Sequence, residues 1–288
     1  PKRQSVPSER DELTKEIRER LSKSIEQRLM ADVPVGAFLS GGLDSTIVVS
    51  VMSDLLTNDV KTFSIGFENE DFDESEEASY VAEHFGTDHR EYTVDLNSMD
   101  IFEKVARHFG EPLADPAVIP TTLLAERASE DVKVVLTGEG SDELFLGYGD
   151  FGTVNDKISY HRQKYGWLPS ITFDVAEFVS RFSPIPNRNY FEYLHTLRSD
   201  EEVILDWVTK NPSEYLKTDL SWNESGLRSL VGESFGDARS TLKKMEAWYL
   251  THWLSDDLLF KIDHSTMASS LEARVPFLDH KLVELLYS

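Results

Sequence analysis

Apolar residues recur along the chain at two spacings, one typical of amphipathic helices and one typical of short buried strands. The first spacing opens the chain, where leucine or isoleucine returns every four residues and predicts a helix over 9–30. Short apolar runs predict strands at 33–39, 60–66, 91–94 and 132–136. Helical spacing predicts further helices at 44–56, 75–85, 100–109, 121–129, 246–264 and 282–288.

Predicted strands and helices alternate from residue 33 to residue 136, and the apolar runs predict strands that are buried on both faces. This alternation is typical of an α/β fold, a parallel twisted sheet flanked by helices. The C-terminal half is expected to be mostly helical. Ligands of such sheets bind beyond the carboxyl ends of the strands. Two glycine-rich turns, one after 33–39 and one after 132–136, therefore indicate a single shared site.

Composition narrows the possible function classes. The 288 residues include 29 Lys and Arg against 52 Asp and Glu, a formal net charge of −23. So acidic a chain is not expected to bind nucleic acid, and no apolar run reaches the roughly 18 residues of a membrane span. With no cysteine, disulfides and thiolate metal sites are excluded. The first residues lack the apolar core of a signal peptide, so we expect a cytoplasmic protein.

The first glycine-rich turn is Ser40-Gly41-Gly42-Leu43-Asp44-Ser45, between a predicted strand and a predicted helix. Its glycines allow a tight turn, and the amides at the start of the helix can bind an anion. Asp44 would repel a phosphate unless a cation such as magnesium lies between them. The turn lacks the lysine of a Walker loop, and alone it fits equally well a plain turn with a capping aspartate.

A second turn, Thr137-Gly138-Glu139-Gly140-Ser141-Asp142-Glu143, repeats this pattern after the strand at 132–136. Its three carboxylates repel one another, which favours a metal, another bound cation or acid–base chemistry. Glu143 fits equally well an ordinary acidic residue in the first turn of a helix. That alternative explains Glu139 and Asp142 together poorly.

These motifs resemble those of the asparagine synthetase family, whose synthetase domain is an ATP pyrophosphatase of the adenine-nucleotide α-hydrolase-like fold. Residues 40–45 are similar to the family's pyrophosphate loop, and TGEGSDELFLGY at 137–148 is similar to its SGEGSDExFGGY. LEARVPFLDHK at 271–281 resembles its LExRxPFLD segment. The likeness covers roughly 13–286 and is weakest over 151–245.

The resemblance implies one asparagine-synthetase-like domain over 1–288. Within it we expect an N-terminal helix over 1–32 and a nucleotide-binding α/β core over 33–150. A helical part over 151–288 would complete the substrate site.

The resemblance also implies roles for single residues. Asp44 and Asp142 would hold Mg²⁺ and the departing phosphates and, with Glu139, form the catalytic set. The pyrophosphate would be cradled by Ser40, Gly41, Gly42 and Ser45. Adenosine would be held, largely by backbone contacts, at Phe38 or Leu39, Ile65, Thr137 and Gly138. The amino-acid substrate would be oriented by Glu139, with further contacts near Asp257, Lys261 and Asp263.

The implied reaction is ATP-dependent amide formation. Aspartate would react with ATP to give β-aspartyl-AMP and pyrophosphate, and ammonia would then displace AMP to give asparagine. A related adenylating enzyme that forms amides or lactams from a different carboxylate is one alternative. A non-catalytic or regulatory adenine-nucleotide-binding protein is the alternative from another class. The oligomeric state stays open, a homo-oligomer included.

The sequence departs from the family in three respects. Glutamine-dependent members begin with a glutaminase domain that uses a nucleophilic cysteine, and this chain has no cysteine. Ammonia is therefore expected from the free pool, from a separate glutaminase or from a missing N-terminal domain. The family carries a lysine beyond the PFLD segment, in a region that these 288 residues do not reach. Leu146 stands where the family usually has glycine.

Several other conspicuous residues are expected to be structural. Arg274 and Asp279 frame an apolar segment and favour an ion pair over substrate contact. The histidines whose spacing does not fit a zinc site are His89, His108 and His264. The aromatic residues expected to pack rather than to stack on bases are Trp248, Tyr249 and Trp253.

Overall fold

The computed structural model describes residues 10–67, 73–94, 99–110, 113, 115–149, 151, 229, 232 and 241–287. The chain divides into two compact units, Pro1–Phe145 with Trp253–Ser288 and Leu146–His252. The sheet and both glycine-rich turns belong to the first unit. Most of 151–245 lies outside the described residues. No helix in the described part of the chain is both long and apolar enough to cross a membrane.

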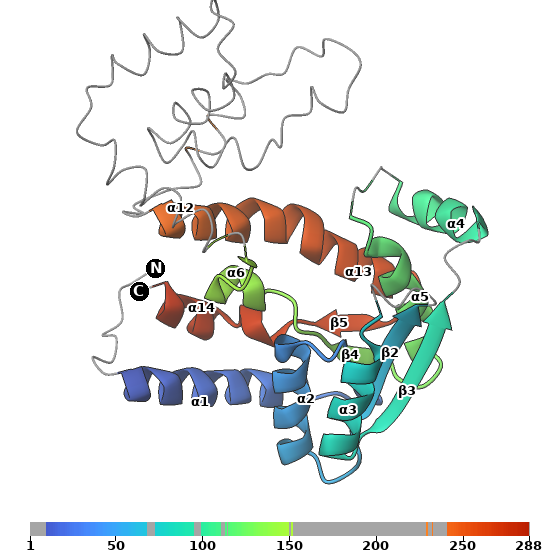
Figure 1. Ribbon diagram of the computed structural model, residues 1–288, viewed down its shortest axis with the longest axis horizontal. Helices are drawn as coiled ribbons and strands as arrows, with labels where there is room; N and C mark the ends of the chain where they lie inside the picture. The colour runs from blue at the N-terminus through green and yellow to red at the C-terminus, as the bar shows by residue number, and fades with distance from the viewer. Residues whose placement is uncertain are drawn as a thin grey trace, which may run out of the picture. The chain divides into compact units, whose positions relative to one another are not determined.

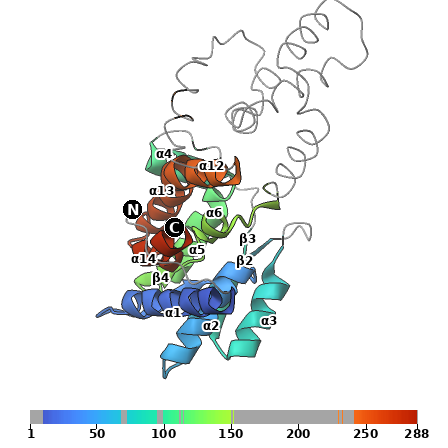
Figure 2. The same ribbon diagram turned by 90° about the vertical axis from the view of Figure 1, so that its left-hand side faces the viewer.

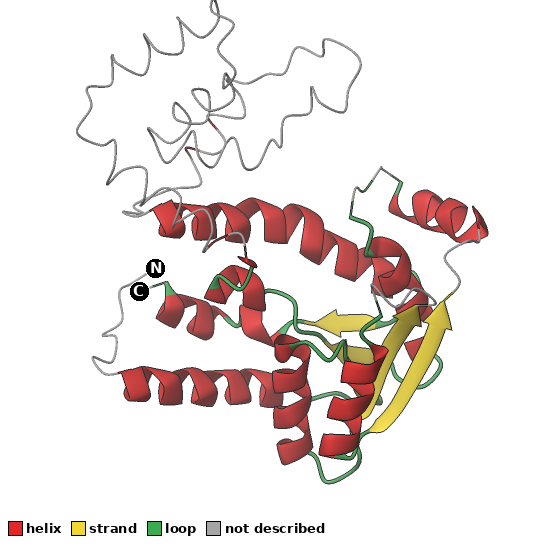
Figure 3. Ribbon diagram, viewed as in Figure 1, coloured by secondary structure: helices red, strands yellow, loops and turns green. Residues whose placement is uncertain are grey.

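The first unit contains a five-stranded sheet in the order β3-β2-β1-β4-β5, drawn in yellow in Figure 3. All neighbouring strands are parallel, which confirms the prediction. The strands are β1 (Val35–Phe38), β2 (Lys61–Phe67), β3 (Asp88–Val94), β4 (Val134–Leu136) and β5 (Glu272–Arg274). Because β2 and β3 extend the sheet to one side of β1 and β4 and β5 to the other, the order reverses between β1 and β4. Open parallel sheets bind their ligands at such a reversal.

Helices cover both faces of the sheet, as Figures 1 and 2 show from two directions. On one side lie α1 (Arg10–Arg28), α2 (Leu43–Leu55) and α3 (Ser75–Phe85). On the other lie α5 (Val118–Ala128) and α13 (Leu259–Met267). The unit also contains α4 (Met99–Phe109), α6 (Ser141–Phe145), the 3₁₀ turn η4 (Pro276–Leu278) and α14 (His280–Leu286). The helices predicted at 44–56, 75–85, 100–109 and 121–129 are confirmed to within a few residues.

The helix predicted over 246–264 differs from the prediction in its pitch. It comprises α12 (Thr241–Trp248), a π-helix η3 (Tyr249–Leu258) and α13. A search for the 3.6-residue period of an α-helix cannot recognise a wider turn, so the sequence predicted one uniform helix. π-Helical segments are frequent at functional sites, and η3 contains Asp257.

The main apolar core lies between the sheet and α5. Phe63 of β2 and Val135 of β4 pack there with Leu124, Ala125 and Ala128 of α5. The central strands β1 and β4 are apolar, as predicted. The same prediction is wrong for the edge strand β3, whose sequence is DHREYTV. The other edge strand, β5, has the sequence EAR and is not among the predicted strands. An edge strand is less covered than a central one and tolerates polar side chains, which also discourage pairing with other chains.

His89 ties the edge strand β3 to its neighbour β2 on the face opposite that core. Its Nδ1 lies 2.9 Å from the Thr62 hydroxyl and its Nε2 lies 3.1 Å from the Ser64 hydroxyl. Both hydroxyl residues are buried. Burial lowers the pKa of His89, against the opposing charge of Glu91. The histidine is therefore a structural bridge in the sheet, as expected.

This arrangement predicts how stability depends on pH. Because the folded pKa of His89 lies below the ordinary value of about 6.5, the neutral ring stabilises the fold above that pH. This contribution is lost as the pH falls through the lower folded pKa. We expect His89→Gln to destabilise the protein at pH 8, and the difference from wild type to shrink at pH 5 to 6. Urea unfolding at both pH values measures it, with the exposed His84→Gln as control; an unchanged difference contradicts the assignment.

Candidate functional site

The two glycine-rich turns contact each other where β1 and β4 end. A Cβ atom added to Gly138 would lie 2.9 Å from Asp44 Cβ and 3.0 Å from the Ser45 amide nitrogen, so only glycine fits here without a shift. The Ser141 hydroxyl donates a hydrogen bond of 2.7 Å to Asp44 Oδ1. Adjacent strands have thus brought together two segments that are about a hundred residues apart in sequence.

The serine hydroxyls of the first turn hold it closed. Ser40 Oγ lies 3.1 Å from Ser45 Oγ, and Ser45 Oγ donates to the Gly42 carbonyl at 3.2 Å. Gly41 has a φ of +80°, which favours glycine. The first ladder bond of α2 runs from Thr46 N to Gly42 O at 3.0 Å, so the preceding amides at the start of α2 are available to an anion.

The charge of Asp142 in the second turn interacts with that of Asp44 in the first. Burial and the charge of Asp44 both raise the pKa of Asp142. The two aspartates therefore lie close enough to repel each other. A cation placed between them would relieve this repulsion, and a divalent ion would do so most effectively.

A buried lysine lies among further carboxylates near the end of β4. Lys261 is only 5% exposed, and its Nζ lies 2.7 Å from Asp115 Oδ2. Burial raises the pKa of Glu139, opposed by the charge of Lys261. The pKa of Asp257 is raised by burial and by Asp115, and Lys261 again opposes the shift. Glu139 consequently takes up a proton more readily than an ordinary glutamate, as acid–base chemistry requires.

The predicted substrate contacts are only partly brought together. Asp257 and Lys261 interact with Glu139 or with each other, so these three residues share one environment. Asp263 is exposed and lies two residues beyond Lys261 on α13, roughly 200° around the helix. No described contact joins Asp263 to that environment, and its role stays a prediction. Glu143 is fully buried in α6, and its charge adds to the raised pKa of Glu139.

The residues predicted to hold adenosine present little side-chain surface. Phe38 and Ile65 pack against the core under α5, and Leu39 is buried. Leu39 could thus offer a ligand little besides its backbone, whereas Phe38 and Ile65 are half-buried, and adenosine binding at these residues stays a prediction. Thr137 Oγ1 is buried and has no hydrogen-bond partner among the described residues. A buried hydroxyl without a partner is costly, so this atom is a candidate for a ligand contact.

The structure adds contacts for two residues to which the sequence assigned no role, Ser141 and Asp115. Ser141 belongs to the second motif, but its bond to Asp44 exists only because β1 and β4 are neighbours. Asp115 precedes α5, and its Oδ1 accepts a hydrogen bond of 2.8 Å from the Ala117 amide. An aspartate just before a helix is a recognisable turn signal. Its pairing with Lys261, 146 residues away, leaves no signal in the sequence.

Among the described residues no group of three or more His, Asp or Glu side chains is arranged to hold a metal. The pair Asp44 and Asp142 could supply two ligands to magnesium, which commonly takes its remaining ligands from water and phosphate.

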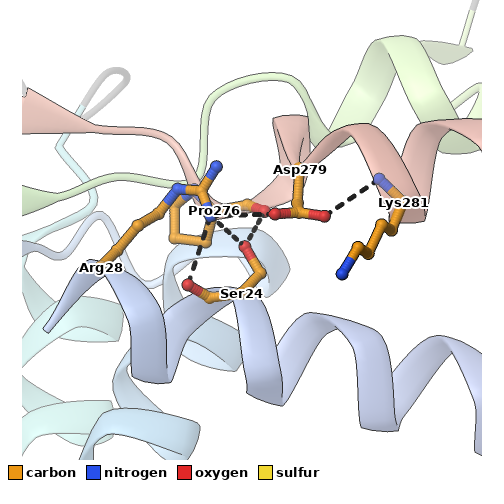
Figure 4. Close-up of polar contacts among 5 residues, drawn as sticks. All are labelled: Ser24, Arg28, Pro276, Asp279 and Lys281. Atoms are coloured by element: carbon orange, nitrogen blue, oxygen red, sulfur yellow. Dashed lines mark hydrogen bonds and ion pairs between the residues drawn. The ribbon is translucent and has the colours of Figure 1, made fainter.

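The third motif, the segment 271–281, packs against the second turn and supports it. A Cβ on Gly140, whose φ is +88°, would lie 2.6 Å from Leu278 Cγ, so η4 packs directly on the second turn. Figure 4 shows how this segment is fixed to α1. Ser24 donates a hydrogen bond of 2.6 Å to the Pro276 carbonyl, and Arg28 Nη1 lies 3.4 Å from Asp279 Oδ2.

Arg274 and Asp279 are structural, as expected, but with partners other than each other. Arg274 Nη1 donates to the carbonyl oxygens of Arg28 and Met30 at 2.6 and 3.0 Å, which closes the C-terminal end of α1. Asp279 pairs with Arg28 and accepts a bond of 3.0 Å from the Lys281 amide at the start of α14. Both side chains therefore fasten the third motif to α1.

The aromatic residues near the end of α12 follow their prediction in part. Trp248 and Tyr249 are buried, as expected for packing residues. Trp253 is 41% exposed, so the packing prediction is wrong for it. The exposed ring lies in η3, where the wider helical turn changes which residues share a face.

Comparison with known proteins places the chain in a wider context. Residues 16–288 match the family described as asparagine synthase. The chain is 34% identical over 278 residues to asparagine synthetase [glutamine-hydrolyzing] 1 of Bacillus subtilis, covering 95% of this chain and 43% of that protein. It is 39% identical over 278 residues to a putative asparagine synthetase [glutamine-hydrolyzing] 2 of Methanocaldococcus jannaschii, covering 93% and 52%. With Amidase chyE of Penicillium rubens it shares 27% identity over 312 residues, covering 95% and 45%. The chain thus spans about half or less of the length of these curated relatives.

The contacts that fasten the third motif to α1 predict a graded loss of stability on substitution of Asp279. Asp279→Ala removes both the helix cap and the pair with Arg28, and we expect the free energy of unfolding to fall by about 1 to 2 kcal/mol. Asp279→Asn keeps a capping oxygen and should lose less than half of this. Urea unfolding compares the two variants with the exposed Asp256→Ala as control. Equal losses for the alanine and asparagine variants would contradict the capping role.

Proposed function

The chain belongs to the asparagine synthase family, and from this premise we propose that it is an ATP-dependent carbon–nitrogen ligase that adenylates a carboxylate and converts it to an amide. The observation that carries the proposal is the contact between the two turns at the reversal point of the sheet. There Ser141 bonds Asp44 at the start of α2, and the charge of Asp44 raises the pKa of the neighbouring Asp142. A triphosphate at that point would meet backbone amides, serine hydroxyls and a divalent cation together.

The pyrophosphate end of ATP is assigned to the first turn. This turn is formed by Ser40, Gly41, Gly42 and Ser45. The amides that precede Thr46 lie at the start of α2, which is the positive end of the helix dipole. In a chain with a net charge of −23 this is how an anion can be bound without a lysine in the turn. Asp44 and Asp142 are assigned to Mg²⁺, with the Ser141 hydroxyl orienting Asp44 through its 2.7 Å bond.

The adenosine end is assigned to the edge of β2 beside the first turn. Pairing of β2 with β1 stops at Phe63, whereas its pairing with β3 continues to Phe67. The β1-side edge of β2 near Ile65 is therefore not covered by a strand and can offer backbone groups to a base. Thr137, whose hydroxyl has no hydrogen-bond partner among the described residues, and Gly138, which lies against the first turn, are assigned to adenosine from the end of β4.

The chemistry follows from what these groups can stabilise. An oxygen of the substrate carboxylate attacks the α-phosphorus of ATP, the bond to the β-phosphate breaks, and pyrophosphate leaves. Bound magnesium supplies charge neutralisation on the departing phosphates. Ammonia then attacks the acyl carbon, the bond to AMP breaks, and the attacking nitrogen loses a proton. Glu139 is the group assigned to accept that proton, because its burial raises its pKa.

We assign aspartate as the carboxylate substrate, which makes asparagine the product. Glu139, Asp257 and Lys261 would contact it, in accordance with their shared environment. The nitrogen is assigned to ammonia, free or released from glutamine by a glutaminase, in line with the relatives named as glutamine-hydrolyzing asparagine synthetases. The relative named an amidase favours a second candidate, in which the same adenylating site serves another carboxylate.

Isotope exchange tests the proposal directly. The full-length protein with Mg²⁺ and ATP should exchange labelled pyrophosphate into ATP when L-aspartate is added, because adenylation is reversible. Exchange supported only by another carboxylate would favour the second candidate. Binding of ATP without exchange for any carboxylate would identify a non-catalytic nucleotide-binding protein and overturn the proposal.

The two turns also predict unequal effects of substitution. Asp142→Asn should lower the exchange rate by at least about 100-fold, since it removes a proposed metal ligand. Ser141→Ala should raise the Mg²⁺ concentration needed for half-maximal rate by roughly 10-fold, since it frees the Asp44 carboxylate to rotate. Asp263→Asn removes the same charge as Asp142→Asn, but at an exposed position. It tests the prediction that Asp263 contacts the amino-acid substrate. Full activity of Asp142→Asn would exclude it from the metal site.

A further inference from the structure

The pair between Lys261 and Asp115 joins α13 to the turn before α5. Lys261 is 5% exposed and the Asp115 side chain is 14% exposed, with 2.7 Å between Nζ and Oδ2. A buried ammonium group costs free energy unless it is paired, so this ion pair fixes where the lysine head can lie. Its partner is on a different element, which makes the position of Nζ depend on tertiary structure.

Asp115 is itself held rigidly. Its Oδ1 accepts the Ala117 amide at 2.8 Å, and its own carbonyl accepts the Val118 amide at 3.3 Å. One carboxylate oxygen is therefore occupied by the turn that starts α5, and the other is left to receive Lys261. Because one of its oxygens is held by the turn, the Asp115 carboxylate has a fixed position, whereas the four-carbon side chain of Lys261 is flexible.

Three acidic groups compete for the same lysine. Lys261 interacts electrostatically with Glu139 and with Asp257, in addition to its direct bond with Asp115. Without Asp115, the flexible ammonium group could move to either of the other two carboxylates. The bond to Asp115 keeps Nζ in one place and leaves the carboxylates of Glu139 and Asp257 free of a direct ion pair with it.

We propose that Asp115 is a positioning residue of the substrate site, which fixes Lys261 so that Glu139 and Asp257 are presented to the carboxylate substrate. The inference rests on the proposed function and adds to it a residue on the α5 side of the sheet. It assigns Asp115 no contact with ATP, because the groups assigned to the phosphates lie in the two glycine-rich turns. A fault at Asp115 should therefore affect one substrate and spare the other.

The test uses Asp115→Asn in the full-length protein. Asparagine can still accept the Ala117 amide and keeps the turn, but it loses the charge that holds Lys261. In pyrophosphate exchange we expect KM for L-aspartate to rise by about tenfold or more while KM for ATP changes less than about threefold. The control is Asp131→Asn, since Asp131 is also an ion-paired aspartate with a 15% exposed side chain but lies at the edge of the sheet with Lys61 and Arg90.

A double-mutant cycle with Lys261→Met separates positioning from general damage. If Asp115 acts through Lys261, adding Asp115→Asn to Lys261→Met should change KM for L-aspartate less than twofold further. This comparison holds even if Asp115→Asn alone folds poorly, because the double variant contains no unpaired buried lysine.

The outcomes distinguish this inference from the proposed function. If wild type exchanges normally, any of three results overturns the inference alone. The effects of Asp115→Asn and Lys261→Met on KM for L-aspartate could multiply in the cycle, Asp115→Asn could change both KM values equally, or it could change neither. Absence of exchange in wild type overturns the proposed function, and the positioning role with it.

Discussion

The candidate site depends on how closely two backbone turns approach. Gly138 comes so near to Asp44 and Ser45 that a single methyl group would separate the turns. This approach in turn requires β1 and β4 to be neighbours, which is the point where the strand order reverses. If the turns were pushed apart, the hydrogen bond from Ser141 to Asp44 would be lost, and the interaction between the charges of Asp44 and Asp142 would weaken. One backbone contact therefore supports the geometry of both acidic groups.

The charge of the chain makes this geometry more demanding. With 52 acidic and 29 basic residues, the protein as a whole repels a polyanion. The first turn offsets this with local dipoles, from the amides at the start of α2 and from the hydroxyls of Ser40 and Ser45. Asp44 and Asp142, whose charges interact, add negative charge nearby, which suits a divalent cation better than a bare phosphate. Electrostatics thus favours a metal–nucleotide complex over the free nucleotide.

The third motif illustrates a different kind of constraint. Its arginine and aspartate are charged and conspicuous, yet both fasten η4 and α14 to α1. Leu278 then packs on Gly140 and supports the second turn. The N-terminal helix consequently contributes to the site without any residue of its own in it. Asp115 acts similarly from the other side of the sheet, through its pair with Lys261.

Local patterns in the sequence determined the fold class, the central strands, most helices and the two glycine-rich turns, because hydrophobic period and glycine placement are properties of neighbouring residues. They could not determine β5, whose three residues are polar and form a strand only by pairing with β4. Nor could they determine the π-helical pitch of η3 or the exposure of Trp253. The hydrogen bond between Ser141 and Asp44 and the ion pair between Asp115 and Lys261 join residues 97 and 146 positions apart. Only tertiary structure decides such contacts, because they depend on the strand order and on the packing of α13 against α5. Neither can be predicted from the spacing of neighbouring residues.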